Sequence, residues 1–411
     1  MNPRDPFRFQ LPGFNSVHSA PVGDSVLLRG SNVTTEDSYI TPPRQLPILA
    51  LHTFTQYLLK SYAVLYPPTS TMSPTAQAEF TFLPLGAIIQ EFRVGGHNIV
   101  RGFATTDHYL QPYNPYYGAT IGRVANRIKD GIIQNLNGRE YKLAQNNGPN
   151  ALHGGKEGWN RREFDGPHTV QRHGRDALLF KYRDQDGEEG YPGTIEVRLW
   201  YTASKEGDGD EAKTVLMAEY EVEFVGDECE ETVVNITNHS YFNISGGPTN
   251  AGTVAQLATD DYLPIDRNGI PTGGLGKFER DVTQPFILEP TEGHIDDVFV
   301  VETDPSKIPL DTRPLPLRRL AQFSHPDTGL HLEVHSTEPA FQFYTGKYTN
   351  VPSIDGAPAQ GEGSSFCVEP SRYVNAINVP EWRNMVVLKR GQVFGCTNVY
   401  KSWKSQPGLD S

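Results

Sequence analysis

The chain has 411 residues, of which 37% are apolar and 21% charged, and it carries 20 Phe and 19 Tyr. This is enough apolar mass for a globular fold of one large or two ordinary domains. Its 49 acidic and 36 basic residues give a formal net charge of −13, and so acidic a surface repels phosphate backbones and anionic lipid, so that we expect neither nucleic acid nor a membrane as a partner.

Three cysteines, Cys229, Cys367 and Cys396, are an odd number and form no C-x-x-C pair. This argues against a disulfide framework and against a zinc ribbon, and it fits a reducing compartment. The first residues, MNPRDPFRFQLPG, lack the apolar core of a signal peptide. The most apolar run, 48–66, contains a histidine, a glutamine and a lysine, which makes it a poor membrane span. We expect a cytoplasmic protein.

Residues 1–71 differ from the rest of the chain. They hold nine prolines and show little alternation of apolar and polar residues, although 48–66 could form one helix. This composition predicts an N-terminal extension that is largely irregular, either an appendage or an upstream extension of the reading frame. We expect residues 72–411 to form the single folded domain.

Strand signals begin at Ala78 and continue to the C-terminus. The run 78–103 alternates, breaks at Gly95–Gly96 and alternates again, which predicts a hairpin. DALLFKYRD (176–184) and TIEVRLWYT (194–202) follow, joined by a turn-rich QDGEEGYPG. The next run, AKTVLMAEYEVEF (212–224), places Leu216, Ala218, Tyr220, Val222 and Phe224 on one face, and Glu219, Glu221 and Glu223 on the other.

Two later runs, GLHLEVHSTEPAFQFYTG (329–346) and NMVVLKRGQVFGCTNVYKSW (384–403), have the same alternating character. Amphipathic helical periodicity is nearly absent. Many short strands separated by Gly, Pro, Asn and Asp predict an all-β fold, a large antiparallel β-sandwich.

Two segments combine glycines with hydrogen-bonding side chains. GATIGRVANRIKDG (118–131) contains Asn126 and Arg127, and an arginine among glycines can donate several hydrogen bonds to an oxygen-rich ligand. A surface ion pair is the alternative. NNGPNALHGGKEGWN (146–160) contains His153, followed by two glycines that let a ligand approach, and Trp159, which offers an apolar face. A histidine in a solvated loop is the alternative.

A second pair of segments carries a histidine and a carboxylate. VVNITNHSYFNISGG (233–247) contains His239 among three asparagines, and SSFCVEPSRYVNAINVPEW (364–382) places Glu369 at the end of an apolar strand. An imidazole of pKa about 6.5 and a carboxylate of pKa about 4.3 form a general acid–base pair at neutral pH. A hydrogen-bonded corner and a strand-end cap are the structural alternatives. GHIDDVF (293–299) adds Asp296 and Asp297.

Other chemistries lack their signatures. The sequence contains neither a G-x-S-x-G elbow nor an H-E-x-x-H pair, and its histidines are scattered. We therefore predict no metal and no cofactor.

Six segments follow one another along the chain: GRVANRI, LHGG, TNHSYFN, the PxDxxGIPTG segment from Pro264 to Gly273, EPAFQFYTG and FCVEP. Together they resemble the aldose 1-epimerase family, also called galactose mutarotases. The resemblance spans roughly residues 78–403, and six motifs in this order are far more specific than any one. It implies a β-sandwich of the galactose mutarotase type. It also implies a cofactor-free isomerase of hexose and galactose metabolism, which interconverts the α and β anomers of a free aldose such as galactose or glucose.

The resemblance also implies roles for single residues. The histidine of TNHSYFN is the family's general acid and corresponds to His239, and the glutamate of FCVEP is its general base and corresponds to Glu369. The three asparagines beside His239 would frame the imidazole. The sugar-hydroxyl contacts of the family correspond to Asn126, Arg127, His153 and Gln342.

One segment departs from the family pattern. The family has an aspartate in a GFDHNF-like segment, whereas this chain has HIDDVF. Alignment on Phe299 selects Asp296 as the sugar contact, and the adjacent Asp297 stays an alternative.

Two alternative functions keep the same fold. A hexose-6-phosphate mutarotase would need cations for the phosphate, for which Lys156, Arg161 and Arg162 are candidates. A non-catalytic sugar-binding or regulatory protein would bind sugar without affecting its anomers, although the presence of both acid and base argues against it. Glycoside hydrolysis generally requires two carboxylates rather than a His–Glu pair. Neither the oligomeric state nor the preferred aldose follows from the sequence.

Overall fold

The computed structural model describes residues 7–9, 79–209 and 212–405. The predicted helix at 48–66 and the predicted boundary at residue 71 lie outside these residues. Strand β1 (Phe7–Phe9) pairs antiparallel with β2 (Phe80–Leu83). β2 continues through β3 (Ile88–Val94) into β4 (His97–Asn98), so the predicted hairpin break at Gly95–Gly96 is confirmed.

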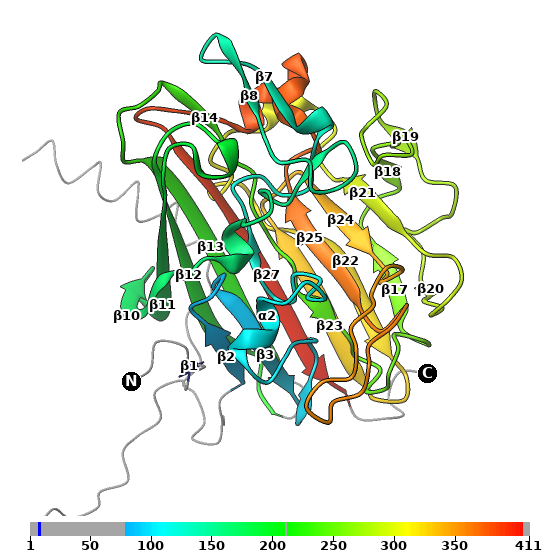
Figure 1. The fold of residues 1–411 in the computed structure, drawn as a ribbon. Helices are drawn as coiled ribbons and strands as arrows, with labels where there is room; N and C mark the ends of the chain where they lie inside the picture. The colour runs from blue at the N-terminus through cyan, green and yellow to red at the C-terminus, as the bar shows by residue number, and fades with distance from the viewer. Residues whose placement is uncertain (1–6, 10–78, 210–211, 406–411) are drawn as a thin grey trace, which may run out of the picture. The chain divides into compact units, whose positions relative to one another are not determined.

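The larger of two main sheets has nine strands (Figure 1). In spatial order they are β10 (Asp165–Arg172), β11 (Arg175–Asp184), β12 (Ile195–Glu206), β13 (Lys213–Phe224), β27 (Val393–Lys404), β23 (Leu330–Ser336), β22 (Arg318–His325), β17 (Val254–Leu257) and β20 (Phe286–Ile287). The second sheet has six strands: β16 (Tyr241–Phe242), β25 (Phe366–Ser371), β24 (Ala340–Tyr344), β21 (Asp296–Val300), β18 (Asp261–Tyr262) and β19 (Gly276–Lys277). Neighbouring strands in both sheets are antiparallel.

The two sheets pack face to face around one apolar core, so the predicted all-β antiparallel sandwich is confirmed. On β13 the predicted apolar face enters this core: Leu216, Ala218, Tyr220 and Val222 are fully buried, and Phe224 packs at its edge. Successive strand residues point to opposite faces, and the six-stranded sheet accordingly contributes every second residue. Its core residues are Phe242, Phe299, Phe341, Phe343, Phe366 and Val368.

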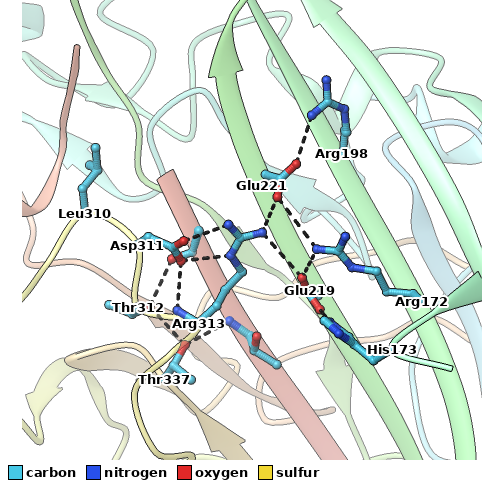
Figure 2. A network of polar contacts seen from close by, with 12 residues as sticks. Arg172, His173, Arg198, Glu219, Glu221, Leu310, Asp311, Thr312, Arg313 and Thr337 are labelled. Atoms are coloured by element: carbon cyan, nitrogen blue, oxygen red, sulfur yellow. Dashed lines mark hydrogen bonds and ion pairs between the residues drawn. The ribbon is translucent and has the colours of Figure 1, made fainter. Parts of the chain in front are cut away.

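The acidic face of β13 lies on the other side of the nine-stranded sheet, in a network of ion pairs (Figure 2). Glu219 pairs with Arg172 and with Nε2 of His173, the latter at 2.8 Å. Glu221 pairs with Arg313 and with Nη1 of Arg198, the latter at 3.0 Å. Although burial opposes ionisation, His173 and Arg172 hold the pKa of Glu219 down to about 2. The charges of β13 are therefore compensated within this face.

Short elements connect the sheets. The remaining strands are β5 (Thr120–Ile121), β6 (Arg127–Ile128), β7 (Ile132–Leu136), β8 (Arg139–Lys142), β9 (Ala151–Leu152), β14 (Glu231–Val233), β15 (Thr237–Asn238) and β26 (Val387–Lys389). One short α-helix, α2 (Thr106–Tyr109), and the 3₁₀ turns Lys129–Gly131, Trp159–Arg161, Glu188–Gly190, Pro305–Lys307, Ala376–Asn378 and Pro380–Met385 complete the described chain. None of the helices in these ranges is both long enough and apolar enough to cross a membrane.

Candidate active site

A pocket of about 610 Å³ opens over the face of the six-stranded sheet that points away from the core. All seven residues that the sequence suggested as a site line it: Asn126, Arg127, His153, His239, Asp296, Gln342 and Glu369. They come from β6 and the residue before it, from the loops after β9 and β15, and from three neighbouring strands of the sheet. The fold thus brings together side chains separated by up to 243 positions in the sequence.

The floor of the pocket follows from the alternation of the strands. Gln342 on β24 stands opposite Glu369 on β25, and Tyr344 on β24 stands opposite Asp296 on β21. Their neighbours along the strands, such as Phe343 and Val368, belong to the apolar core. One face of the sheet therefore packs in the main core, and the other carries the polar pocket residues beside a second apolar cluster that includes Val298, Val300 and Ala340.

The same alternation separates the two adjacent aspartates. Asp296 lines the pocket, and its Oδ1 accepts a hydrogen bond from Nε2 of Gln342 at 2.7 Å. Asp297 stands opposite the core residue Phe343 and is not among the pocket-lining residues. Burial raises the pKa of both carboxyl groups. Of the two, Asp296 is the one in reach of a ligand.

His239 follows β15, which pairs with β5. Its backbone N–H donates to the carbonyl of Ala119 at 2.9 Å, and its own carbonyl accepts from the N–H of Gly118 at 3.0 Å. Asn238 supports the same turn, because its Nδ2 donates to the carbonyl of Gly118 at 2.9 Å and its Oδ1 accepts from Ser240. The side chains of Asn238 and Asn243 donate hydrogen bonds to backbone carbonyls and do not line the pocket.

The imidazole of His239 and the carboxyl of Glu369 meet inside the pocket. Nε2 of His239 lies 3.4 Å from Oε1 of Glu369, and the side chains are 6% and 5% exposed. Burial lowers the pKa of His239 to about 3. Burial raises the pKa of Glu369 well above its ordinary range; the nearby Asp296 adds to this rise and Arg127 opposes it. Because burial disfavours both charges, the free pair carries its proton on the carboxyl.

His153 is fixed by reciprocal hydrogen bonds with Asn126. The backbone N–H of Asn126 donates to Nδ1 of His153 at 3.2 Å, and the N–H of His153 donates to the carbonyl of Asn126 at 3.1 Å. Burial, with help from His239 and Arg127, lowers the pKa of His153 well below its ordinary value. A neutral imidazole that accepts at Nδ1 carries its proton at Nε2. His153 is therefore a hydrogen-bond donor at its free nitrogen.

The amides and Arg127 form one hydrogen-bonded chain along the wall. Nδ2 of Asn126 donates to Oε1 of Gln342 at 2.8 Å, and its Oδ1 accepts from Nη1 of Arg127 at 3.3 Å. Nε of Arg127 donates to Oδ1 of Asn147 at 3.0 Å. The side chains of this wall are oriented before any ligand arrives.

His153, His239 and Glu369 bring three possible metal ligands within 4.8 Å of one another. The hydrogen bond at Nδ1 of His153 decides against this set, because the proton at Nε2 leaves that nitrogen without a lone pair for a metal. These three residues fit proton transfer better than metal binding.

The expectation for Trp159 is wrong. Trp159 does not offer its face to a ligand: it is buried, and its Nε1 donates to Oδ2 of Asp184 at 2.8 Å. Arg123, in the segment GATIGRVANRIKDG, pairs with the same side chain. Its guanidinium is fully buried and lies 2.6 Å from Oδ1 of the same Asp184. The arginine four positions from Arg127 thus supports the core beside the pocket.

The sequence reasoning missed the tyrosines of the pocket, which are Tyr116, Tyr241, Tyr344 and Tyr348, and it gave no role to 265–269, which also line it. A signal existed for Tyr241, because it lies two residues after His239. A signal existed for Tyr344 as well, since strand alternation places it on the same face as Gln342. The position of Tyr116 depends on tertiary packing.

Comparisons with known proteins agree on one family. Residues 68–401 match the family model described as aldose 1-epimerase. The bifunctional protein gal10 of Schizosaccharomyces pombe is 35% identical over 78% of this chain and 44% of its own length. Galactose mutarotase of Sus scrofa is 35% identical over 73% of this chain and 82% of its own length. The chain thus spans less than half of the bifunctional relative.

Solved structures share the fold. The GalM/aldose epimerase homologue from C. elegans has a TM-score of 0.65 at 23% identity, covering 80% of this chain and 96% of that one. Galactose 1-epimerase from Lactobacillus acidophilus has a TM-score of 0.63 at 20% identity, covering 83% of this chain and 98% of that one.

Proposed function

Because the chain belongs to the aldose 1-epimerase family, we propose that it is an isomerase that interconverts the α and β anomers of a free aldose such as galactose or glucose. The observation that carries this proposal is the buried contact of 3.4 Å between His239 and Glu369 on the wall of a pocket of about 610 Å³. Mutarotation requires two proton transfers at oxygens of one small molecule, and an acid and a base at this spacing suffice for them.

In the proposed reaction, His239 donates a proton to the ring oxygen while Glu369 takes the proton of the C1 hydroxyl. The bond between C1 and the ring oxygen breaks, and C1 becomes an aldehyde carbon. Rotation about the C1–C2 bond then exposes the other face of the aldehyde. Glu369 returns its proton to the carbonyl oxygen as the ring oxygen attacks C1 and gives its proton back to His239, so atoms and protons balance over the cycle.

The pair needs no extra proton from solvent to reach its reactive state. A neutral imidazole beside a protonated carboxyl and an imidazolium beside a carboxylate contain the same number of protons. Moving one proton across the 3.4 Å contact converts one state into the other. A polar sugar in the pocket stabilises the charged state through its hydroxyl groups.

The sugar hydroxyls would bind to groups that are already oriented. His153 presents an N–H, and Arg127 presents its remaining guanidinium N–H groups. Asp296 offers carboxylate oxygens as acceptors and is held by Nε2 of Gln342, which donates to its Oδ1 at 2.7 Å. Asn126 positions the first two of these residues. Such pre-oriented donors and acceptors reduce the entropic cost of placing the ring between the acid and the base.

The direct test is polarimetry on freshly dissolved α-galactose and α-glucose. Purified protein should speed the approach to anomeric equilibrium well above the rate in buffer. Sugar binding in calorimetry without any acceleration would instead support a non-catalytic sugar-binding protein.

A phosphorylated sugar is the weaker candidate substrate. Arg161 and Arg162, which were considered as phosphate ligands, pair with Glu157 and Glu188 respectively, and neither they nor Lys156 line the pocket. Because none of these three candidate phosphate ligands reaches the pocket, a free aldose is favoured. Comparing rates on glucose and glucose 6-phosphate would separate the two substrates.

We also propose that residues 72–411 form the catalytic domain, preceded by an N-terminal extension, and that the enzyme works in the cytoplasm. The three cysteines, free in the structure, support a reducing compartment. The acidic net charge of −13 argues against nucleic acid as a partner.

A further inference from the structure

Two tyrosine rings stack on the imidazole of His239. The centroid of the Tyr241 ring lies 5.0 Å from that of the imidazole, with 11° between the planes. The centroid of the Tyr116 ring lies 5.7 Å away, with 23° between the planes. The ring of His153 approaches nearly perpendicular, at 77° and 5.2 Å. Tyr116 and Tyr241 thus turn π faces, rather than ring edges, toward the proposed acid.

The backbone ties both tyrosines to this arrangement. Tyr116 has a φ of 72°, a left-handed conformation that a bulky residue adopts only where its surroundings enforce it. The turn that follows is bonded to His239 on both sides, through the N–H of Gly118 and the carbonyl of Ala119. Tyr241 lies in β16, paired with Cys367 on β25, the strand that carries Glu369.

A cationic imidazole in this place has few stabilising neighbours. Nδ1 of His239 is buried and has no hydrogen-bond partner among the described residues. The groups that face the ring are the carboxyl of Glu369, the neutral His153 and the two tyrosines. The face of an aromatic ring carries negative electrostatic potential and attracts a cation, most strongly where water is excluded.

We infer that Tyr116 and Tyr241 are positioning residues for the proposed reaction, whose ring faces fix the plane of the His239 imidazole and stabilise its cationic form. This inference rests on the proposed function for its role in the rate, but the effect on the charge of His239 exists without substrate. In this arrangement two uncharged side chains stabilise the imidazolium of a buried histidine, so that the histidine can act as an acid.

The test replaces Tyr116 or Tyr241 first by Phe and then by Phe with increasing numbers of ring fluorines. Fluorine withdraws charge from the ring face and hardly changes its shape, so folding is preserved where a Leu substitution could disturb it. Each Phe variant keeps the ring face and gives the reference rate for its own series. The rate of mutarotation should then fall with each fluorine, by about 10- to 30-fold at full substitution, as expected for a desolvated cation–π contact.

The matched control is the same series at Phe323, which stacks on Phe366 in the apolar core at 4.2 Å and does not line the pocket. Fluorination there should leave the rate unchanged. If the rate did not change with the number of fluorines at Tyr116 and Tyr241 while the variants stayed folded, the inference would be wrong. The two rings would then only pack against the imidazole.

A second readout separates this inference from the proposed function. The ring-nitrogen NMR shifts of His239, recorded without sugar over a series of pH values, report the pH at which the imidazole becomes cationic. Fluorination at Tyr116 or Tyr241 should move this midpoint to lower pH, whereas the Phe323 series should not. If the wild type failed to accelerate mutarotation but the midpoint moved, only the proposed reaction would be wrong. An unmoved midpoint would reject the role of the tyrosines.

Discussion

Nε2 of His239 lies 3.4 Å from Oε1 of Glu369, although the two residues are 130 positions apart in the sequence. One follows the short strand β15, and the other lies within β25 of the six-stranded sheet. At this distance the two groups share one proton, and the reactivity of either depends on the other. The pair therefore makes predictions that a lone histidine or a lone glutamate would not.

Removing either member should abolish most of the activity. His239→Ala and Glu369→Gln should each reduce kcat by about 10²- to 10⁴-fold, the usual contribution of a general acid or base. Because the two act in one step, the double variant should be little worse than either single variant. Polarimetry measures the rates. His335→Ala, on β23 and outside the pocket, is the control, and losses that simply multiply in the double variant would contradict a concerted pair.

The pH profile should lack the inflection near 6.5 that a free histidine would give. Activity needs one proton on the pair. It is lost at low pH when His239 binds a second proton, with a pKa of about 3. It is lost at high pH when Glu369, whose pKa is raised, gives up the shared proton. After subtraction of the buffer rate, kcat/KM should be flat from about pH 5 to 7. A limb near 6.5 would contradict the assignment.

The two adjacent aspartates should differ in effect. Asp296→Asn weakens a pocket acceptor and should lower kcat/KM by about 10- to 100-fold, the range for a hydrogen bond to a charged group. Asp297 faces away from the pocket, so Asp297→Asn should change kcat/KM little. Because the charge of Asp296 raises the pKa of Glu369, Asp296→Asn should also move the alkaline limb to lower pH. Equal losses in the two variants would refute the distinction.

Glu369→Gln should stabilise the fold while it abolishes activity. In the wild type the folded carboxyl keeps its proton at a pH where the unfolded chain has lost it. Ionisation of the unfolded chain therefore lowers the wild-type free energy of unfolding as pH rises from about 4.3 toward the raised folded pKa. Glutamine does not titrate, so its advantage should grow over this window and reach about 1 kcal/mol. Thermal unfolding at pH 4.5 and pH 7.5 measures it, and an advantage that shrinks with pH would contradict the sign.

Asp184→Ala should destabilise the domain through the core beside the pocket. The carboxylate of Asp184 lies 2.6 Å from the buried guanidinium of Arg123 and accepts from the indole of Trp159 at 2.8 Å. Removing one partner leaves a buried charge without compensation, which costs about 3–5 kcal/mol. Urea unfolding followed by circular dichroism tests this value. Glu157→Ala, which removes an exposed partner of Arg161, should cost less than about 1 kcal/mol.

Strand alternation made much of this fold predictable. The apolar and acidic faces of β13 follow from period two, and so does the hairpin of β3 and β4 in the four-stranded sheet. The same rule resolves the aspartates: Phe299 is buried in the core, so Asp297 shares its face and Asp296 takes the other. Alternation alone did not predict the proton-transfer pair or the amides of the wall. They were predicted because six segments, in their order along the chain, resemble one family.

Strand alternation does not predict where the side chains of loop residues lie. Trp159 and Tyr116 both lie beside glycines or tyrosines in turn-rich segments, yet one is buried against Asp184 and the other faces the pocket. The tautomer of His153 depends on a single backbone N–H from Asn126, 27 residues earlier in the chain. Such contacts form only when distant loops meet, so the local sequence carries no pattern for them.

Gln342 and Glu369 reach the pocket only while their strand neighbours Phe343 and Val368 face the core. Strand length is therefore the most sensitive property of the six-stranded sheet. A substitution in β24 or β25 changes one contact, whereas a one-residue insertion would turn Phe343 toward the sugar and Gln342 into the core. The same strand register therefore places the core residues in the core and the proton-transferring residues in the pocket. Changes of length can be absorbed in the connection 345–365, whose Tyr348 borders the pocket. Changes in this connection can alter the shape of the pocket, and with it the preferred substrate, without moving the acid or the base.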